Sequence, residues 1–331
     1  MIVTIVVSAV VLMVVAETVF VAIRYLPIVA NLFMNVTVRA EPGEAERLRG
    51  EEVAFDTADG VRLVGTLTRA PGDLPSAPVI VFCHEFGADR HSAVKNVAFL
   101  RDAGFRLFAF DFRGHGESEI QVGYSPRHWV TEYELRDLRA ALTFLKDRRD
   151  TTGARIGLLG MSRGAATAII VAADDPSVVA VVSDGAFSTS HTLHDYMRRW
   201  GPIFVDPYLL VLSRPHFVLS TFRWLAMKLA EHRMAVRCVS VVRALRRLKT
   251  PILFIHGEKD GYIEMGQAKL LFEIAGGPKE LWVVPEADHN EAVDVAPAEY
   301  GRRVMHFFRA ALGGTEPAVS ANTRQNLASC G

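Results

Sequence analysis

The sequence predicts an α/β fold with a mostly parallel sheet and helices on both of its faces. Short apolar runs alternate along the chain with segments of helical periodicity. The runs lack apolar–polar alternation, which is typical of strands covered on both sides. They lie at 78–83, 105–110, 155–160, 178–183, 251–256 and 281–285. A further run, 61–68, alternates like a half-buried strand. The helical patterns lie near 91–103, 131–148, 163–174, 265–275 and 297–312.

Composition excludes several classes of protein. The 331 residues are 50% hydrophobic, which is enough for one large domain or two small ones. Lys plus Arg equals Asp plus Glu at 37 each, so we expect no nucleic-acid partner. The three cysteines, Cys83, Cys238 and Cys330, are odd in number and far apart, so they form no disulfide framework and favour a reducing compartment.

The first segment is strongly apolar. Residues 1–16 carry no charge, and after Glu17 the apolar run resumes up to Arg24. This length approaches the ~20 residues that cross a bilayer as a helix. We therefore expect a single-pass transmembrane anchor at 1–24 and a linker at 25–50 along the membrane surface.

Two alternatives to this anchor are a cleaved signal peptide, which lacks its basic n-region here, and a buried helix, which Glu17 favours. Arg24 and Arg39 follow the segment, so the positive-inside rule indicates a cytoplasmic body.

Two further regions depart from the strand–helix rhythm. The stretch at about 190–240 has no clear central strand and is rich in aromatic, leucine and proline residues. We interpret it either as a pair of packed helices or as a lid over an apolar pocket, and the two interpretations are compatible. The polar tail 313–331 is expected to be disordered.

Residues 160–164 have the pattern G-x-S-x-G between a strand and an Ala-rich helix. A sharp strand-to-helix turn leaves no room for side chains at Gly160 and Gly164, and it lifts the hydroxyl of Ser162 above the sheet. The N–H of Arg163 then faces a developing oxyanion. The alternative is a serine that only caps a helix.

A serine nucleophile needs a base and an orienting carboxylate. Asp260 and His289 follow two successive apolar runs, and Ser162, Asp260 and His289 stand in the Ser…Asp…His order of one hydrolase architecture. Asp184 is the next candidate acid, whereas Asp288 adjoins the histidine and is expected to point elsewhere. Three more histidines at strand ends are interpreted as hydrogen-bonded loop side chains: His84, His115 and His256.

Residues from about 50 to 312 resemble the α/β-hydrolase superfamily, specifically its single-domain serine esterase-like members. The stretches that carry the resemblance are VFCHEFGADR (81–90), DFRGHGES (111–118), GMSRG (160–164), HGEKDGYI (256–263) and ADHNEA (287–292). The resemblance implies a central sheet of about eight strands with a Ser-His-Asp triad on its edge. We expect this hydrolase domain at 51–312, with the helical lid insertion at about 190–240. The serine disfavours the family's dehalogenases and epoxide hydrolases, which use aspartate there.

The segment after the third strand departs from the family pattern. The resemblance implies that Phe86 donates the second oxyanion N–H, alongside Arg163. Glu85 occupies the usual glycine position and is expected to point away from the oxyanion, toward Arg90. A zinc-protease motif is excluded because H-E-x-x-H requires a histidine where Ala88 stands. We expect neither a metal nor a cofactor.

These features predict a serine hydrolase acting on carboxylic esters or thioesters. The apolar first segment and the apolar residues 200–230 favour hydrophobic acyl substrates. The expected partners are a small-molecule acyl ester or thioester and the lipid bilayer. The alternative is a catalytically inactive, membrane-tethered binding or scaffold protein, because a fold does not establish a function.

Overall fold

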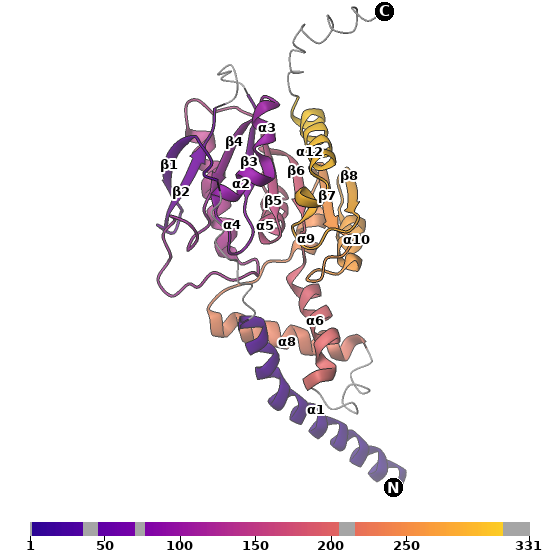
Figure 1. Cartoon of the computed structure of the whole chain (residues 1–331). Helices are drawn as coiled ribbons and strands as arrows, with labels where there is room; N and C mark the ends of the chain where they lie inside the picture. The colour runs from indigo at the N-terminus through magenta and orange to yellow at the C-terminus, as the bar shows by residue number, and fades with distance from the viewer. Residues whose placement is uncertain (1, 36–45, 70–76, 205–215, 314–331) are drawn as a thin grey trace, which may run out of the picture.

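The computed structural model describes residues 2–35, 46–69, 77–204 and 216–313. They contain an eight-stranded sheet in the order β1-β2-β4-β3-β5-β6-β7-β8, in which β1–β2 and β2–β4 are antiparallel and all other pairs are parallel. The predicted α/β fold with a mostly parallel sheet is confirmed (Figure 1). The strands are β1 (Glu51–Asp56), β2 (Arg62–Leu67), β3 (Val79–Cys83), β4 (Arg106–Phe110), β5 (Ile156–Met161), β6 (Val178–Asp184), β7 (Ile252–Gly257) and β8 (Lys279–Val284).

Helices cover both faces of the sheet. The central strands β3, β4, β5 and β7 are buried along their whole length, which explains their unbroken apolar sequences. One face packs against α4 (Glu132–Asp147), α5 (Arg163–Ala172), α9 (Val241–Arg247) and α10 (Met265–Ile274). The other packs against α2 (Ala93–Val97), α3 (Phe99–Asp102), α11 (Ala292–Val295) and α12 (Pro297–Leu312), and the short 3-10 helix η1 (Arg90–Ser92) leads into α2.

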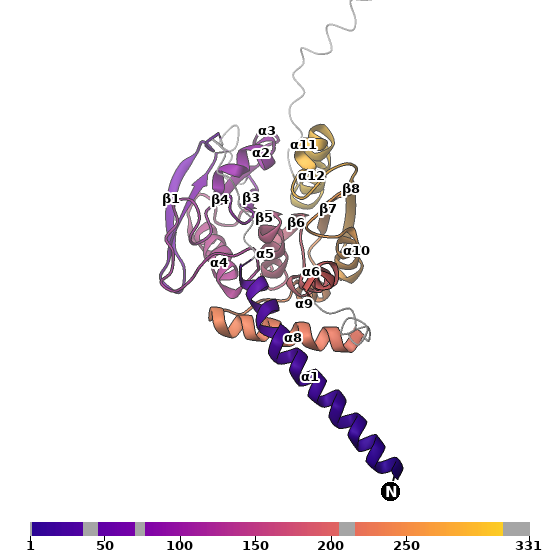
Figure 2. The same cartoon turned by 60° about the horizontal axis from the view of Figure 1, so that its bottom comes forward.

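Three further helices gather at the carboxyl-end edge of the sheet: α1 (Ile2–Asn35), α6 (Thr189–Phe204) and α8 (His216–Met234). In both views α8 lies across α1, and α6 packs beside α8 (Figures 1 and 2). A separate apolar cluster, here called the cap cluster, joins them to loops of the sheet edge. Its buried members are Ala30, Phe33, Trp129, Phe187, Leu193, Ala230 and Ile263.

The predicted membrane anchor is wrong. Within the described ranges, no helix combines the length and the apolar character needed to cross a bilayer. The predicted boundary at residue 24 is also absent, since α1 runs without a break from Ile2 to Asn35. Its C-terminal part packs on protein, where Ala30 and Phe33 are buried in the cap cluster. The apolar composition of the segment did not by itself predict these contacts with the rest of the chain.

The predictions of a membrane location and of a cytoplasmic catalytic domain rested on this anchor, so they lose their basis. Residues 25–35 of the predicted linker belong to α1, while residues 36–45 lie outside the described part of the chain. The tail predicted to be disordered also lies outside it, from residue 314 onward. The predicted lid region contains α6 and α8, with residues 205–215 outside the description.

Candidate active site

Ser162 stands at the sharp turn between β5 and α5. Its backbone adopts φ 49° and ψ −112°, a conformation that non-glycine residues rarely take and that the surrounding structure must enforce. The Ser162 N–H donates to the carbonyl of Asp184 at the end of β6, with an N–O distance of 2.7 Å. A Cβ at Gly160 would lie 2.5 Å from the backbone of Ala165, and one at Gly164 would overlap the carbonyl oxygen of Cys83. Gly160 therefore allows β5 to pack against the first turn of α5, and Gly164 allows α5 to pack against the end of β3.

A continuous hydrogen-bonded chain links the three residues predicted as a triad. The Nε2 atom of His289 lies 2.8 Å from Oγ of Ser162, and its Nδ1 atom lies 2.7 Å from Oδ2 of Asp260. The Asp260 side chain is 1% exposed and that of His289 is 15% exposed. The imidazole thus connects a buried carboxylate to the hydroxyl of Ser162, a half-buried residue.

The loop after β7 holds Asp260 in place. Its second oxygen, Oδ1, accepts hydrogen bonds from the N–H groups of Tyr262 (2.9 Å) and Ile263 (2.7 Å). His256 donates from Nε2 to the carbonyl of Ile263 at 2.9 Å, and burial lowers the pKa of His256. This carboxylate is therefore satisfied by backbone donors, which leave one oxygen for His289.

The other acids near His289 have different roles. Asp288 accepts from the N–H groups of Gly261 (2.9 Å) and His289 (2.7 Å), so it shapes the loop and points away from the imidazole, as the sequence predicts. Asp184 is fully buried, and in the described part of the chain its Oδ2 has no hydrogen-bond partner. Burial raises the pKa of Asp184 to about 7. The structure thus brings Asp260, and not Asp184, into contact with the imidazole.

The two predicted oxyanion donors lie on adjoining segments. Arg163 is the first residue of α5, where helix N–H groups have no partner within the helix. Phe86 follows β3, and its ring lies 5.3 Å from the guanidinium carbon of Arg163. His84 fixes the intervening loop, since its Nδ1 lies 2.7 Å from the Glu85 carbonyl and its Nε2 accepts from the Phe112 N–H at 3.1 Å.

Glu85 does not reach Arg90, contrary to the sequence expectation. Arg90 is instead occupied by Asp111, Glu52 and Glu117. The Oε2 atom of Glu85 is buried without a hydrogen-bond partner among the described residues, and burial raises its pKa. The expectation failed because three carboxylates distant in sequence compete for the same guanidinium.

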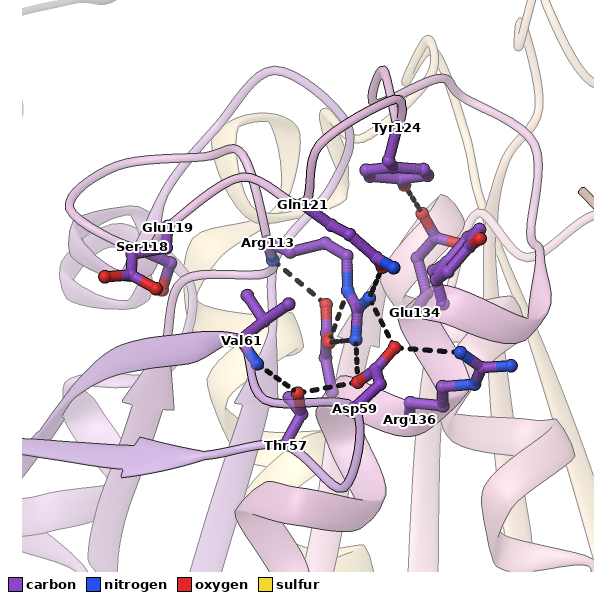
Figure 3. A network of polar contacts seen from close by, with 12 residues as sticks. Thr57, Asp59, Val61, Arg113, Ser118, Glu119, Gln121, Tyr124, Glu134 and Arg136 are labelled. Carbon is purple, nitrogen blue, oxygen red and sulfur yellow. Dashed lines mark hydrogen bonds and ion pairs between the residues drawn. The ribbon is translucent and has the colours of Figure 1, made fainter. Parts of the chain in front are cut away.

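The loop 111–118 is anchored by a buried ion network around Arg113 (Figure 3). The Arg113 guanidinium, which is fully buried, pairs with Asp137 of α4 at 2.6 Å and with Asp59 at 2.9 Å. Arg136 joins the same Asp59 carboxylate from a more exposed position. The network ties the turn after β1 to α4 and so fixes the loop that carries His115.

No cluster of three or more His, Cys, Asp or Glu side chains in the described ranges is arranged to hold a metal ion.

The sequence analysis missed two features near the candidate site. One is the cap cluster, in which Phe187 and Ile263 come from loops beside the candidate triad. The other is the complete burial of the Arg163 side chain. The only sequence signal for either was the apolar character of the segments that converge.

Comparison with known proteins agrees with this architecture. The model for the α/β hydrolase fold family matches residues 78–243, and the chain belongs to that family. The uncharacterized protein YqkD of Bacillus subtilis is 26% identical over 247 residues, covering 72% of each chain. The uncharacterized protein YfhR of Escherichia coli K12 is 25% identical over 271 residues, covering 79% of this chain and 81% of the relative.

Solved structures show the same fold. An esterase of Pyrococcus furiosus, Pf2001, superposes with a TM-score of 0.60 at 22% identity, covering 84% of this chain and 96% of that one. A hydrolase from Pseudomonas aeruginosa superposes with a TM-score of 0.55 at 22% identity, covering 79% and 99%. Fold and family together support a hydrolase.

Proposed function

We propose that this protein is a serine hydrolase that cleaves carboxylic esters or thioesters through an acyl-enzyme intermediate. The observation that carries the proposal is the chain from Ser162 Oγ through His289 to Asp260, with distances of 2.8 and 2.7 Å. A hydroxyl needs such a base to become nucleophilic at neutral pH, and the base needs an orienting carboxylate.

In the proposed cycle, Nε2 of His289 accepts the Ser162 proton as Oγ attacks the acyl carbonyl carbon. The N–H groups of Arg163 and Phe86 hold the resulting oxyanion, each such donor contributing ~3–4 kcal/mol. His289 then protonates the departing alcohol or thiol. A water that gives its proton to the same imidazole releases the acid and restores Ser162. Asp260 holds the tautomer and stabilises the imidazolium.

The surroundings favour a hydrophobic acyl group. Ile263, whose N–H holds Asp260, belongs to the cap cluster, and so does Phe187, three residues after Asp184. The same cluster includes Leu193 of α6 and Ala230 of α8. Burying each substrate methylene here would contribute about 0.8 kcal/mol.

A fluorophosphonate probe tests the proposal directly. The full-length protein should be labelled, Ser162→Ala should not, and Ser183→Ala should be labelled as the wild type is. Ser183 is a suitable control because it is a buried serine on the neighbouring strand β6. Absence of labelling in wild type, beside a reacting control hydrolase, would favour the alternative, a catalytically inactive binding or scaffold protein on this fold.

The acyl preference has its own test. The value of kcat/KM for p-nitrophenyl esters should rise from acetyl to octanoyl. A flat or falling series would contradict the hydrophobic acyl assignment while leaving the serine mechanism intact.

A further inference from the structure

Arg163, the residue that follows the proposed nucleophile, has a fully buried side chain. It is 0% exposed, although arginine is almost never fully buried unless it is paired. Its Nη1 donates to the carbonyl of Arg127 at 2.8 Å, and its Nη2 donates to Nε2 of His115 at 3.2 Å. The carboxylate nearest to it is Glu134, 3.7 Å away. These contacts fix the plane of the guanidinium.

Two aromatic rings lie against this guanidinium. Its central carbon is 5.3 Å from the ring centroids of both Phe86 and Phe112. A guanidinium stacks on aromatic faces while its N–H groups remain hydrogen-bonded at the edge, which a lysine ammonium cannot do. The arrangement therefore depends on arginine in particular.

Arg163, whose guanidinium contacts the Phe86 ring, is also the residue that follows the proposed nucleophile, Ser162. In the proposed mechanism the backbone N–H groups of Arg163 and Phe86 are the two oxyanion donors. The Arg163 side chain thus connects one donor residue to the other through a contact outside the backbone. Its partner His115 stays a neutral acceptor, because burial and the charge of Arg163 lower the pKa of His115 to about 3.

We infer that the Arg163 side chain is a positioning residue that sets the separation of the two oxyanion N–H groups by stacking on Phe86. This inference rests on the proposed function, since only an enzyme that forms an oxyanion needs such a spacing. A displacement of a donor by about 1 Å lowers turnover by up to about 100-fold.

The test uses full-length Arg163→Met, Arg163→Lys and Phe86→Leu. We measure kcat and KM on p-nitrophenyl butyrate per active site titrated with fluorophosphonate, together with the affinity for a trifluoromethyl ketone. We expect kcat to fall by about 10- to 100-fold with little change in KM, and the affinity for the ketone, which mimics the oxyanion, to fall in parallel. Phe86→Leu keeps the backbone N–H and removes only the ring, so it decides the matter if Arg163→Met does not fold.

Arg106→Met is the matched control. It removes another buried arginine, at the first residue of β4 and so at the opposite end of that strand from the loop 111–118, whose Nη1 donates to the carbonyl of Asp150. It should lower stability and leave kcat per titrated site unchanged. The inference is overturned if Arg163→Met and Phe86→Leu keep wild-type kcat, if Arg106→Met loses kcat equally, or if Arg163→Lys restores full turnover. Those outcomes leave fluorophosphonate labelling dependent on Ser162. A wild type that is not labelled, or a Ser162→Ala variant that is, would instead refute the proposed function itself.

Discussion

The contact of α1 with the cap cluster predicts that Phe33→Ala releases the C-terminal end of this helix, whereas Phe20→Ala does not. Phe33 is 1% exposed, and its ring stacks on Trp129 with a centroid distance of 4.3 Å and an interplanar angle of 8°. The Trp129 indole N–H also donates to the Phe33 carbonyl at 2.7 Å. Phe20 lies on the same helix but is 58% exposed.

The magnitude follows from what the substitution removes. Truncation of a buried phenylalanine to alanine costs about 3–5 kcal/mol, of which the stacked aromatic pair accounts for about 0.5–1.5 kcal/mol. The hydrogen bond from Trp129 uses the Phe33 backbone carbonyl, so it survives the substitution. We therefore expect a loss at the lower end, ~3 kcal/mol. Phe20→Ala should stay within about 0.5 kcal/mol.

Amide hydrogen exchange measures this loss locally. Phe33→Ala should speed exchange in residues 25–35 by roughly 100-fold, because 1.4 kcal/mol corresponds to a factor of ten, and should leave α5 protected. Equal protection in both variants, or equal loss in both, would refute the reasoning that α1 is held by this contact.

Two further predictions concern buried charge. Asp184 has a folded pKa of about 7, above its unfolded value of 3.8, so the native state binds more protons between those values and wild-type stability falls as pH rises through the window. Asp184→Asn should remove up to ~4 kcal/mol of that decline. Denaturant titrations at pH 4 to 8 would show this as a weaker dependence of the unfolding free energy on pH in the variant than in wild type. The same pH dependence in both proteins would contradict the prediction. Arg113→Met should cost about 3–5 kcal/mol because it leaves Asp137, which is 0% exposed, without its cation. Arg136→Met, at an exposed partner of the same network, should cost less than about 1 kcal/mol of unfolding free energy. Equal losses in Arg113→Met and Arg136→Met would contradict the reasoning that the burial of Arg113 and Asp137 sets the cost.

The sheet and the positions of the candidate triad were predictable because both follow from local sequence. A strand buried on both faces needs an unbroken apolar run, and a tight elbow needs glycine at two fixed positions beside Ser162. Strand β1 was not predictable in this way. It is an edge strand that pairs on one side with β2, and its sequence, EEVAFD, is mostly exposed.

The features that escaped prediction depend on contacts between distant segments. Nothing near Phe33 indicates that Trp129 will stack on it, and nothing near Glu85 indicates that Arg90 will be taken by other carboxylates. The apolar composition of α1 likewise did not indicate that its C-terminal part would pack against α8.

Glu85 shows how burial can resolve a conflict that the sequence raises. A carboxylate beside an oxyanion site would oppose the charge that forms there. Burial, however, raises the pKa values of both Glu85 and Asp184, so both are shifted toward the neutral acid. Around the Ser162 turn, burial therefore weakens the two negative charges that would oppose the oxyanion of the proposed mechanism.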